Sequence, residues 1–267
     1  MKILITGGCG FLGSNLASSF LKENSEIIII DSLFRKGSQE NLAWLKSQAQ
    51  HNQLHFIQAD ISNESLIDQI FQKYAPFSYV CHLAGQVAMT TSIKDPTLDF
   101  RTNVQGTFNI LEKMRKYSKN SLLAFSSTNK VYGDLEWAKK EEKETRYILT
   151  QFPEGLDETI PLDFSTPYGC SKGSADQYVR DWARVYGLKT VVFRHSSIFG
   201  GRQYSTYDQG WIGWFTQQIL NQVNHRKNNE QFTPFTISGN GKQVRDVLHS
   251  SDLVSLYKAA FYKKNKM

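Results

Sequence analysis

The stretch KILITGGCGFLG, residues 2–13, decides the fold class. Its first five residues are a predicted strand, and the glycines that follow have the spacing GxxGxxG at Gly7, Gly10 and Gly13. Such glycines permit a tight turn and a close approach of the backbone to a pyrophosphate, which then meets the N-terminus of the next helix, expected over 13–21. The stretch predicts a dinucleotide-binding turn in which Gly7, Gly10, Phe11, Leu12 and Gly13 contact the cofactor.

The second predicted strand, EIIIID at residues 26–31, ends in an aspartate, Asp31. At this distance from the glycine turn, an acidic side chain can bind the hydroxyls of an adenosine ribose. Asp31 would repel a phosphate on that ribose, so we expect NAD rather than NADP, although Arg35 and Lys36 follow closely. The alternative interpretation is a tight glycine turn and a chance aspartate.

Apolar strands and amphipathic helices alternate along the chain. Further strands are predicted at HFIQAD, YVCHLAG, LLAFSS and TVVFRHSS, and further helices at SQENLAWLKSQAQ, SLIDQIFQKY, 100–117 and 168–186. This alternation is typical of an α/β protein with a doubly wound parallel sheet that is covered on both faces.

Two segments break the alternation. Residues 134–166 are rich first in Lys and Glu and then in turn residues, and the chain from Gly200 onward is aromatic and polar. We therefore expect a Rossmann domain over residues 1–198 with a loop excursion at 134–166, and a small substrate lobe over 199–267 interleaved with it. The chain stops at KKNKM soon after a helix expected to begin at Asp252, so this lobe is expected to be truncated.

The carboxyl ends of the predicted strands supply further candidate cofactor contacts, because ligands of doubly wound sheets bind there. Asp60 and Ile61 close the third strand, where a carboxylate could accept a hydrogen bond from the adenine amino group. Capping of the next helix is the alternative role for Asp60. Leu83, Ala84 and Gly85 close the fourth strand, where small residues let the backbone pass close to the cofactor.

Composition and charge limit the class of protein. The 267 residues, of which 40% are hydrophobic, can form a sizeable core, and the longest apolar run, 27–30, is too short to span a bilayer. The formal charge of +6 suits an anionic ligand but is scattered over the predicted surface, so we expect neither a nucleic-acid nor a membrane partner. Without an export signal or metal-ligand spacing among the three cysteines, we expect a cytoplasmic protein with reduced thiols and no metal.

A tyrosine and a lysine stand four residues apart in YGCSK, at Tyr168 and Lys172, and so share one helical face. The strand before them ends in SSTNKVYG, residues 126–133, where Thr128 offers a hydroxyl. A tyrosine, with an ordinary pKa of about 10, becomes a base near neutrality only if a cation and hydrogen bonds favour its anion. Lys172 can supply that charge, and Thr128 can hold a reacting hydroxyl beside Tyr168 during hydride transfer to nicotinamide.

Together, TGGCGFLG, Asp31, NVQGT, SSTNKVYG, YGCSK and VRDVLHSSDLV make the whole chain resemble the extended short-chain dehydrogenases/reductases that modify nucleotide sugars. The resemblance implies a catalytic triad of Thr128, Tyr168 and Lys172, of which the last two also contact NAD. Asn103 is the usual fourth member, with helix capping or bending as its alternative role. His195 is implied beside the nicotinamide, and the helices beginning near Asn103 and Tyr168 imply a homodimer or higher homo-oligomer.

The residues after the catalytic hydroxyl distinguish activities within this branch. Sugar-nucleotide 4,6-dehydratases carry an Asp-Glu pair there, because eliminating water requires an acid and a base. This chain has Asn129 and Lys130, which disfavours dehydration. AGQVAMTTSIKDP, PLDFSTPYGCSKGSADQY, FRHSSIFGGRQ and DQGWIGWF resemble instead the CDP-tyvelose 2-epimerases, also called CDP-paratose 2-epimerases. That resemblance implies a CDP-sugar substrate, inverted at C2 of its hexose through a transient 2-keto sugar, with NAD regenerated.

Several residues are candidate substrate contacts: Gln86, Thr90, Thr128, Ser197, Arg202 and Arg245. Arg202 and Arg245 are candidates for the diphosphate, because a guanidinium binds phosphate bidentately, and a surface ion pair is the alternative for each. Gln86 and Thr90 are either sugar or nicotinamide contacts or solvated loop residues. Trp211 and Trp214 either line the pocket or belong to the core.

Two other functions stay open. One is a related 4-epimerase or a net oxidoreductase with the same triad, and the other is an NAD-binding sensor or scaffold without chemistry. The intact Tyr168 and Lys172 argue against a sensor, whereas the shortened C-terminal lobe favours it.

Overall fold

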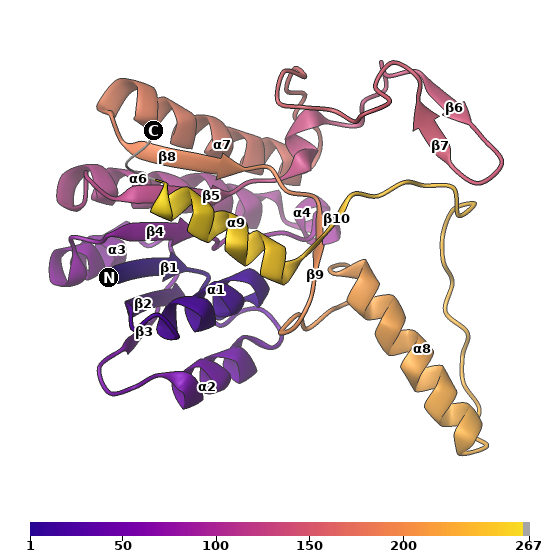
Figure 1. Ribbon diagram of the computed structural model, residues 1–267, viewed down its shortest axis with the longest axis horizontal. Coiled ribbons are helices and arrows are strands. Elements are labelled where there is room, and N and C mark those ends of the chain that lie inside the picture. Colours follow the sequence, from indigo (N-terminus) through magenta and orange to yellow (C-terminus); the bar gives the residue numbers. More distant parts are fainter. Residues whose placement is uncertain (264–267) are drawn as a thin grey trace.

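The computed structural model describes residues 1–263 and has a six-stranded parallel sheet at its centre (Figure 1). The strands of this sheet, in chain order, are β1 (Lys2–Thr6), β2 (Glu26–Asp31), β3 (Leu54–Gln58), β4 (Tyr79–His82), β5 (Leu122–Ser126) and β8 (Lys189–Phe193). They lie in the spatial order β3-β2-β1-β4-β5-β8. The order reverses between β1 and β4, so the loops after these strands open a crevice at the carboxyl edge of the sheet. The predicted doubly wound parallel sheet is confirmed.

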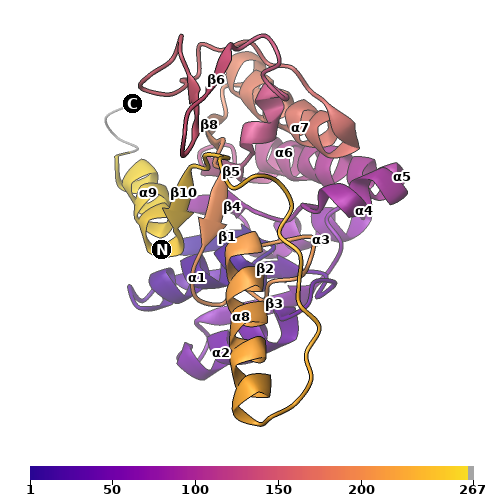
Figure 2. The ribbon, with the colours of Figure 1, turned by 90° about the vertical axis from the view of Figure 1, so that its right-hand side faces the viewer.

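Helices cover both faces of the sheet, as Figures 1 and 2 show from two sides. One face carries α1 (Phe11–Leu21), α2 (Ser38–Gln48) and α9 (Ser250–Tyr262), and the other carries α3 (Glu64–Tyr74), α6 (Gly106–Tyr117) and α7 (Thr166–Tyr186). Successive side chains of a strand point to opposite faces, so Ile27 and Ile29 pack on the α1 side and Ile28 and Ile30 on the α3 side. The apolar run of β2 is therefore buried on both faces.

Short elements complete the described chain. They are α4 (Met89–Lys94), α5 (Pro96–Asp99), the π-helix η1 (Phe100–Gln105), the 3₁₀-helix η2 (Asn129–Tyr132), the hairpin strands β6 (Lys140–Glu142) and β7 (Tyr147–Leu149), α8 (Trp211–Lys227), and the parallel pair β9 (Ser197–Phe199) and β10 (Val247–His249). The helix expected over 100–117 thus begins as a π-helix. The loop excursion expected at 134–166 contains the small hairpin.

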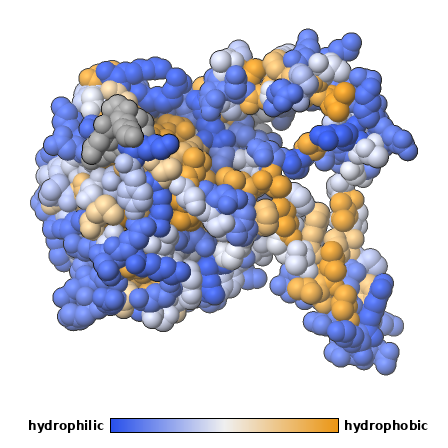
Figure 3. Space-filling view, in the orientation of Figure 1, coloured by the Kyte–Doolittle hydropathy of each residue, from blue (hydrophilic) through white to orange (hydrophobic). Residues whose placement is uncertain are grey.

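The segment after residue 198 contributes to two regions of the molecule. Leu253, Tyr257 and Phe261 of α9 are buried in the core that α1 also lines. α8 has no buried residue and projects away from the sheet, and its exposed Ile219 and Leu220 add to the apolar surface seen there in Figure 3. The division between residues 198 and 199 stays a prediction. Over residues 1–263, no helix combines the length and apolar character needed to cross a bilayer.

Candidate active site

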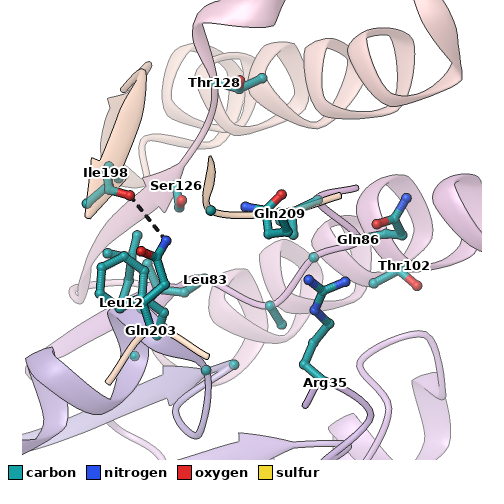
Figure 4. A pocket seen from close by; sticks show the side chains of 18 of the residues that line it. Leu12, Arg35, Leu83, Gln86, Thr102, Ser126, Thr128, Ile198, Gln203 and Gln209 are labelled. Atoms are coloured by element: carbon teal, nitrogen blue, oxygen red, sulfur yellow. Dashed lines mark hydrogen bonds between the residues drawn. The ribbon is translucent and has the colours of Figure 1, made fainter. Parts of the chain in front are cut away.

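A cleft of about 800 Å³ lies at the carboxyl edge of the sheet, partly shown in Figure 4. Its size is in the range of cofactor and small-molecule sites. It brings together most of the predicted site residues: Gly7, Gly10, Phe11, Leu12, Gly13, Asp31, Asp60, Ile61, Leu83, Ala84, Gly85, Gln86, Thr128, Tyr168, Lys172, His195, Ser197, Arg202 and Arg245.

The glycine turn between β1 and α1 has no room for side chains. Gly7 has a φ of +70°, and a Cβ there would lie 2.7 Å from the Ala84 backbone nitrogen. A Cβ on Gly13 would lie 2.1 Å from the Gly7 carbonyl oxygen. The N-cap of α1 is Gly10, which has no side chain to bond the first backbone N–H groups of the helix. Those N–H groups therefore stay available to a ligand. This turn fits a pyrophosphate, which the N-terminal end of the helix dipole also favours.

Asp31 at the end of β2 is held by the same turn. Its carboxylate accepts hydrogen bonds from the backbone N–H of Cys9 at 2.9 Å and of Leu33 at 2.8 Å. Burial raises the pKa of Asp31, against the lowering effect of these hydrogen bonds. Each carboxylate oxygen has a second lone pair, so Asp31 can still accept the two hydroxyls of a ribose. The residues therefore fit the adenosine half of a dinucleotide.

Asp60, at the end of β3, lines the cleft from an exposed position. Its carboxylate accepts from the backbone N–H of Ser62 at 2.8 Å. The N-cap of α3 is Asn63, whose side chain accepts from the N–H of Leu66. The capping role considered for Asp60 therefore belongs to Asn63, and contact with adenine stays a prediction.

Thr128 and Tyr168 line the other end of the cleft, and their hydroxyls lie close enough to interact. Burial raises the pKa of Tyr168, the interaction with the Thr128 hydroxyl lowers it, and the negative charge of Asp99 raises it. The backbone N–H of Lys130 donates to the Thr128 hydroxyl at 3.2 Å, which holds that side chain in place. The pair can receive a substrate hydroxyl between a donor and a base.

Lys172 lies one turn of α7 beyond Tyr168 and is buried. Its ammonium donates to the Ser126 carbonyl at 2.6 Å and lies 4.3 Å from the centre of the Phe125 ring. Burial lowers the pKa of Lys172 to about 8, although Asp176 raises it. His195 accepts from or donates to Ser126 at 2.9 Å, and burial and the charge of Lys172 lower its pKa to about 4. His195 is therefore neutral at pH 7, and Lys172 is mostly charged.

A buried ion pair supports the strand end that carries Thr128. Asp176 on α7 accepts two hydrogen bonds of 2.9 Å from the Arg194 guanidinium and one of 2.7 Å from the Ser127 hydroxyl. Arg194 also donates to the Tyr132 hydroxyl at 2.9 Å. The sequence interpretation missed these residues. The signal available was an aspartate four residues after Lys172, on the same face of the helix.

Some predicted residues do not form the wall of the cleft. Asn103 is buried in η1, where its amide binds the backbone of Gln86 and the hydroxyl of Ser171. Thr90 lies on α4, and its hydroxyl is 3.4 Å from an Asp208 carboxylate oxygen. Trp214 packs against Tyr207 and two phenylalanines, whereas Trp211 lines the cleft and lies within hydrogen-bond distance of Ser197.

Several residues that line the cleft had no role predicted from the sequence. They include Phe34, Gln203, Tyr204, Tyr207 and Gln209. Gln203 donates to the Ile198 carbonyl at 3.2 Å, which Figure 4 shows, and so orients the segment after β9. Single polar or aromatic residues in irregular segments carry no periodic signal, so only the folded chain brings them to the site.

The fold and the cleft define an α/β protein with a dinucleotide-type glycine turn at one end of the cleft and Thr128 and Tyr168 at the other. The model of the NAD dependent epimerase/dehydratase family matches residues 3–267. The chain belongs to this family, which confirms the resemblance to extended short-chain dehydrogenases/reductases and the expectation of NAD as cofactor.

Two curated relatives cover all or nearly all of the chain. The CDP-paratose 2-epimerase of Salmonella typhi is 55% identical over 270 residues, covering 100% of this chain and 76% of that protein. A putative UDP-glucose 4-epimerase of Methanocaldococcus jannaschii is 31% identical, covering 99% of this chain and 75% of that protein.

Solved structures share the fold. The UDP-glucose 4-epimerase of Thermus thermophilus in complex with NAD has a TM-score of 0.76 and 27% identity, over 98% of this chain and 75% of that chain. The UDP-glucose 4-epimerase of Thermotoga maritima with UDP-glucose has a TM-score of 0.74 and 31% identity, over 96% of this chain and 71% of that chain.

Proposed function

We propose that the protein is an NAD-dependent isomerase that inverts C2 of a CDP-linked hexose. The observation that carries the proposal is the 55% identity over the whole chain to the CDP-paratose 2-epimerase of Salmonella typhi. The cleft supports it, because it joins a dinucleotide turn to the hydroxyls of Thr128 and Tyr168.

The charges around Thr128 argue against dehydration. Asn129 and Lys130 follow it, and Asp31, Asp60 and Asp208 are the carboxylates among the described residues that line the cleft. Asp31 and Asp60 belong to the adenosine half, and Asp208 accepts from Thr206 at 2.7 Å. Elimination of water needs an acid and a base beside the sugar, and this cleft offers no carboxylate pair beside Thr128 among residues 1–263.

The chain's own residues perform the proton transfers. Bound along the glycine turn, NAD supplies the hydride acceptor and donor. Thr128 holds the C2 hydroxyl of the sugar against Tyr168, and Tyr168 takes its proton as the 2-keto sugar forms. Tyr168 then returns a proton to the inverted C2 oxygen. The charge of Lys172 favours the phenolate, which is the form that Tyr168 has before the first transfer and again after the second.

The two arginines proposed for the substrate diphosphate reach the cleft from different segments. The Arg202 guanidinium lies 4.5 Å from the Trp44 ring centre, and the backbone carbonyl of Arg202 accepts from Asn41 at 3.2 Å. Arg245 lines the cleft from the segment before β10 and donates to the Val244 carbonyl at 2.9 Å. The Arg245 guanidinium keeps further donors for a phosphate, because it makes only this hydrogen bond among the described residues.

Incubation with CDP-paratose tests the proposal. We expect NMR to show conversion to the C2 epimer until an equilibrium is reached, without release of free NADH. Inversion at C4 of a nucleotide sugar would support the related 4-epimerase, the function named for the M. jannaschii relative. Accumulating NADH would indicate a net oxidoreductase. Bound NAD without turnover of any CDP-hexose would favour a sensor and contradict the proposal.

We also propose that the chain forms a homodimer through α6 and α7. Phe108 and Tyr178 on these helices are 40% and 39% exposed, and with Trp182 they form an aromatic cluster in edge-to-face contacts. Exposed aromatic clusters of this kind are typical of interfaces. The change Tyr178→Lys is expected to shift the mass measured by light scattering from dimer to monomer. A monomeric mass for the unaltered chain would contradict the proposal.

A further inference from the structure

Asp99, the last residue of α5, is a buried carboxylate that neither the sequence interpretation nor the proposed mechanism uses. It is 1% exposed, and none of the ion pairs within residues 1–263 includes it. Its Oδ1 accepts from Gln86 Nε2 at 2.7 Å, and its Oδ2 accepts from Ser171 Oγ at 3.2 Å. A buried charge without a cation is costly, so its retention calls for a reason.

The two donors to Asp99 come from two different segments that border the cleft. Gln86 follows Gly85 in the loop after β4, on the side expected to contact the cofactor. Ser171 stands between Tyr168 and Lys172 on α7, and its hydroxyl lies 3.0 Å from the Tyr168 carbonyl. Asp99 therefore connects the loop after β4 to the helical turn that carries both reacting side chains.

Asn103 reinforces the same connection. Its Nδ2 donates to the Gln86 carbonyl at 3.1 Å and to Ser171 Oγ at 2.9 Å, and its Oδ1 accepts from the Gln86 N–H at 2.9 Å. The Gln86 side chain closes on its own loop, where Oε1 accepts from the Ala88 N–H at 2.6 Å and Nε2 donates to the Ala88 carbonyl at 2.8 Å. Gln86 is thus engaged within the protein, with Asp99 as its partner from α5.

We propose that Asp99 is a positioning residue for the reaction: it fixes the loop 85–88 against the first turn of α7 and so sets how Tyr168 and Lys172 face the cleft. The inference rests on the proposed role of Tyr168. It adds a role for Asp99 to that of Asn103, which is buried beside it and binds the same two residues, Gln86 and Ser171.

The charge of Asp99 adds an electrostatic effect to this placement. Asp99 from α5 is the charged group that acts on Tyr168, while Lys172 from α7, Lys130 and His195 line the same cleft. Of these, Asp99 raises the pKa of Tyr168. A raised pKa leaves less of Tyr168 as phenolate near neutral pH, so the charge of Asp99 opposes that of Lys172 in setting the protonation of the tyrosine.

The change Asp99→Asn separates charge from shape. The amide oxygen can accept from Gln86, and the amide N–H can donate to Ser171, whose own hydrogen can go to the Tyr168 carbonyl 3.0 Å away. Without the negative charge the pKa of Tyr168 falls, so the acid limb of the profile of kcat against pH moves to lower pH. We also expect kcat at the optimum to fall about tenfold with little change in KM, because an amide holds Gln86 and Ser171 less firmly than a carboxylate does and Tyr168 is then placed less precisely.

Two further variants isolate the connection. Ser171→Ala keeps the charge and removes the link to α7, so it should lower kcat by about 10- to 100-fold without moving the acid limb. Asp95→Asn is the matched control, because Asp95 is an exposed carboxylate at the N-cap of α5 and asparagine caps equally well. It should leave both kcat and the pH profile unchanged.

The outcomes distinguish this inference from the proposed function. If the unaltered protein inverts C2 but Asp99→Asn, measured per folded active site, keeps its kcat and its pH profile, the positioning role is wrong. A loss of folded protein alone, with Ser171→Ala fully active, would also overturn it. Failure of the unaltered protein to act on CDP-paratose would instead contradict the proposed function.

Discussion

Replacing Tyr168 by phenylalanine is expected to lower kcat by about 10²- to 10⁴-fold, the range of a lost general acid–base group, while NAD stays bound. The change removes one oxygen atom and keeps the ring that lines the cleft. The proton of the C2 hydroxyl then has no acceptor, because His195 is held by Ser126 and Lys172 by the Ser126 carbonyl. The measurement is single-turnover conversion of CDP-paratose, with NAD quantified in the same preparation.

A matched control lies on the same helix. Tyr186, at the far end of α7, stacks on the Arg115 guanidinium at 5.0 Å and is 39% exposed, away from the cleft. Tyr186→Phe makes the identical chemical change and should leave kcat within about twofold, because exposed substitutions cost little. A Tyr168→Phe variant that keeps kcat within tenfold of the unaltered protein would show that another group moves the proton.

The sheet and the cofactor half of the site could be predicted because their signals are local. The run EIIIID is apolar at consecutive positions, since a central parallel strand is buried on both faces. The glycines of the turn are only six residues apart from first to last, Gly7 to Gly13, so their spacing is visible without the fold. The structure places Asp31 beside the same turn, as the sequence interpretation expected.

The buried hydrogen bonds that hold the reacting residues in place could not be predicted, because they join segments that are far apart in the sequence. Asp99 and Ser171 are 72 residues apart in the chain, and Ser127 and Asp176 are 49 apart. A buried aspartate has no sequence pattern that separates it from an exposed one, so Asp99 resembles any residue at a helix end. Likewise, the π-helix that turns Asn103 toward Gln86 and Ser171 interrupts an otherwise ordinary helical pattern.

The change Gly13→Ala is expected to abolish stable retention of NAD. The added Cβ would lie 2.1 Å from the Gly7 carbonyl oxygen and 2.6 Å from the Gly8 Cα, both of which are backbone atoms. The turn has no room to shift away from the added atom. Gly7 has a φ of +70° and packs so tightly on the next loop that a Cβ there would lie 2.7 Å from the Ala84 backbone nitrogen. Relief of the clash must move the first turn of α1 away from β1, and with it the amides offered to the pyrophosphate.

Overpacking costs up to about 3 kcal/mol, and a strain of that size on the binding turn corresponds to a loss of NAD affinity on the order of 100-fold. Calorimetric titration with NAD, together with the NAD content of the purified protein, measures the effect. Gly201→Ala is the matched control, since a Cβ there meets nothing within 4 Å and its φ is not in the left-handed region. Affinity for NAD within tenfold of the unaltered value in Gly13→Ala would place the pyrophosphate elsewhere in the cleft, because a ligand that depends on these amides cannot tolerate their displacement.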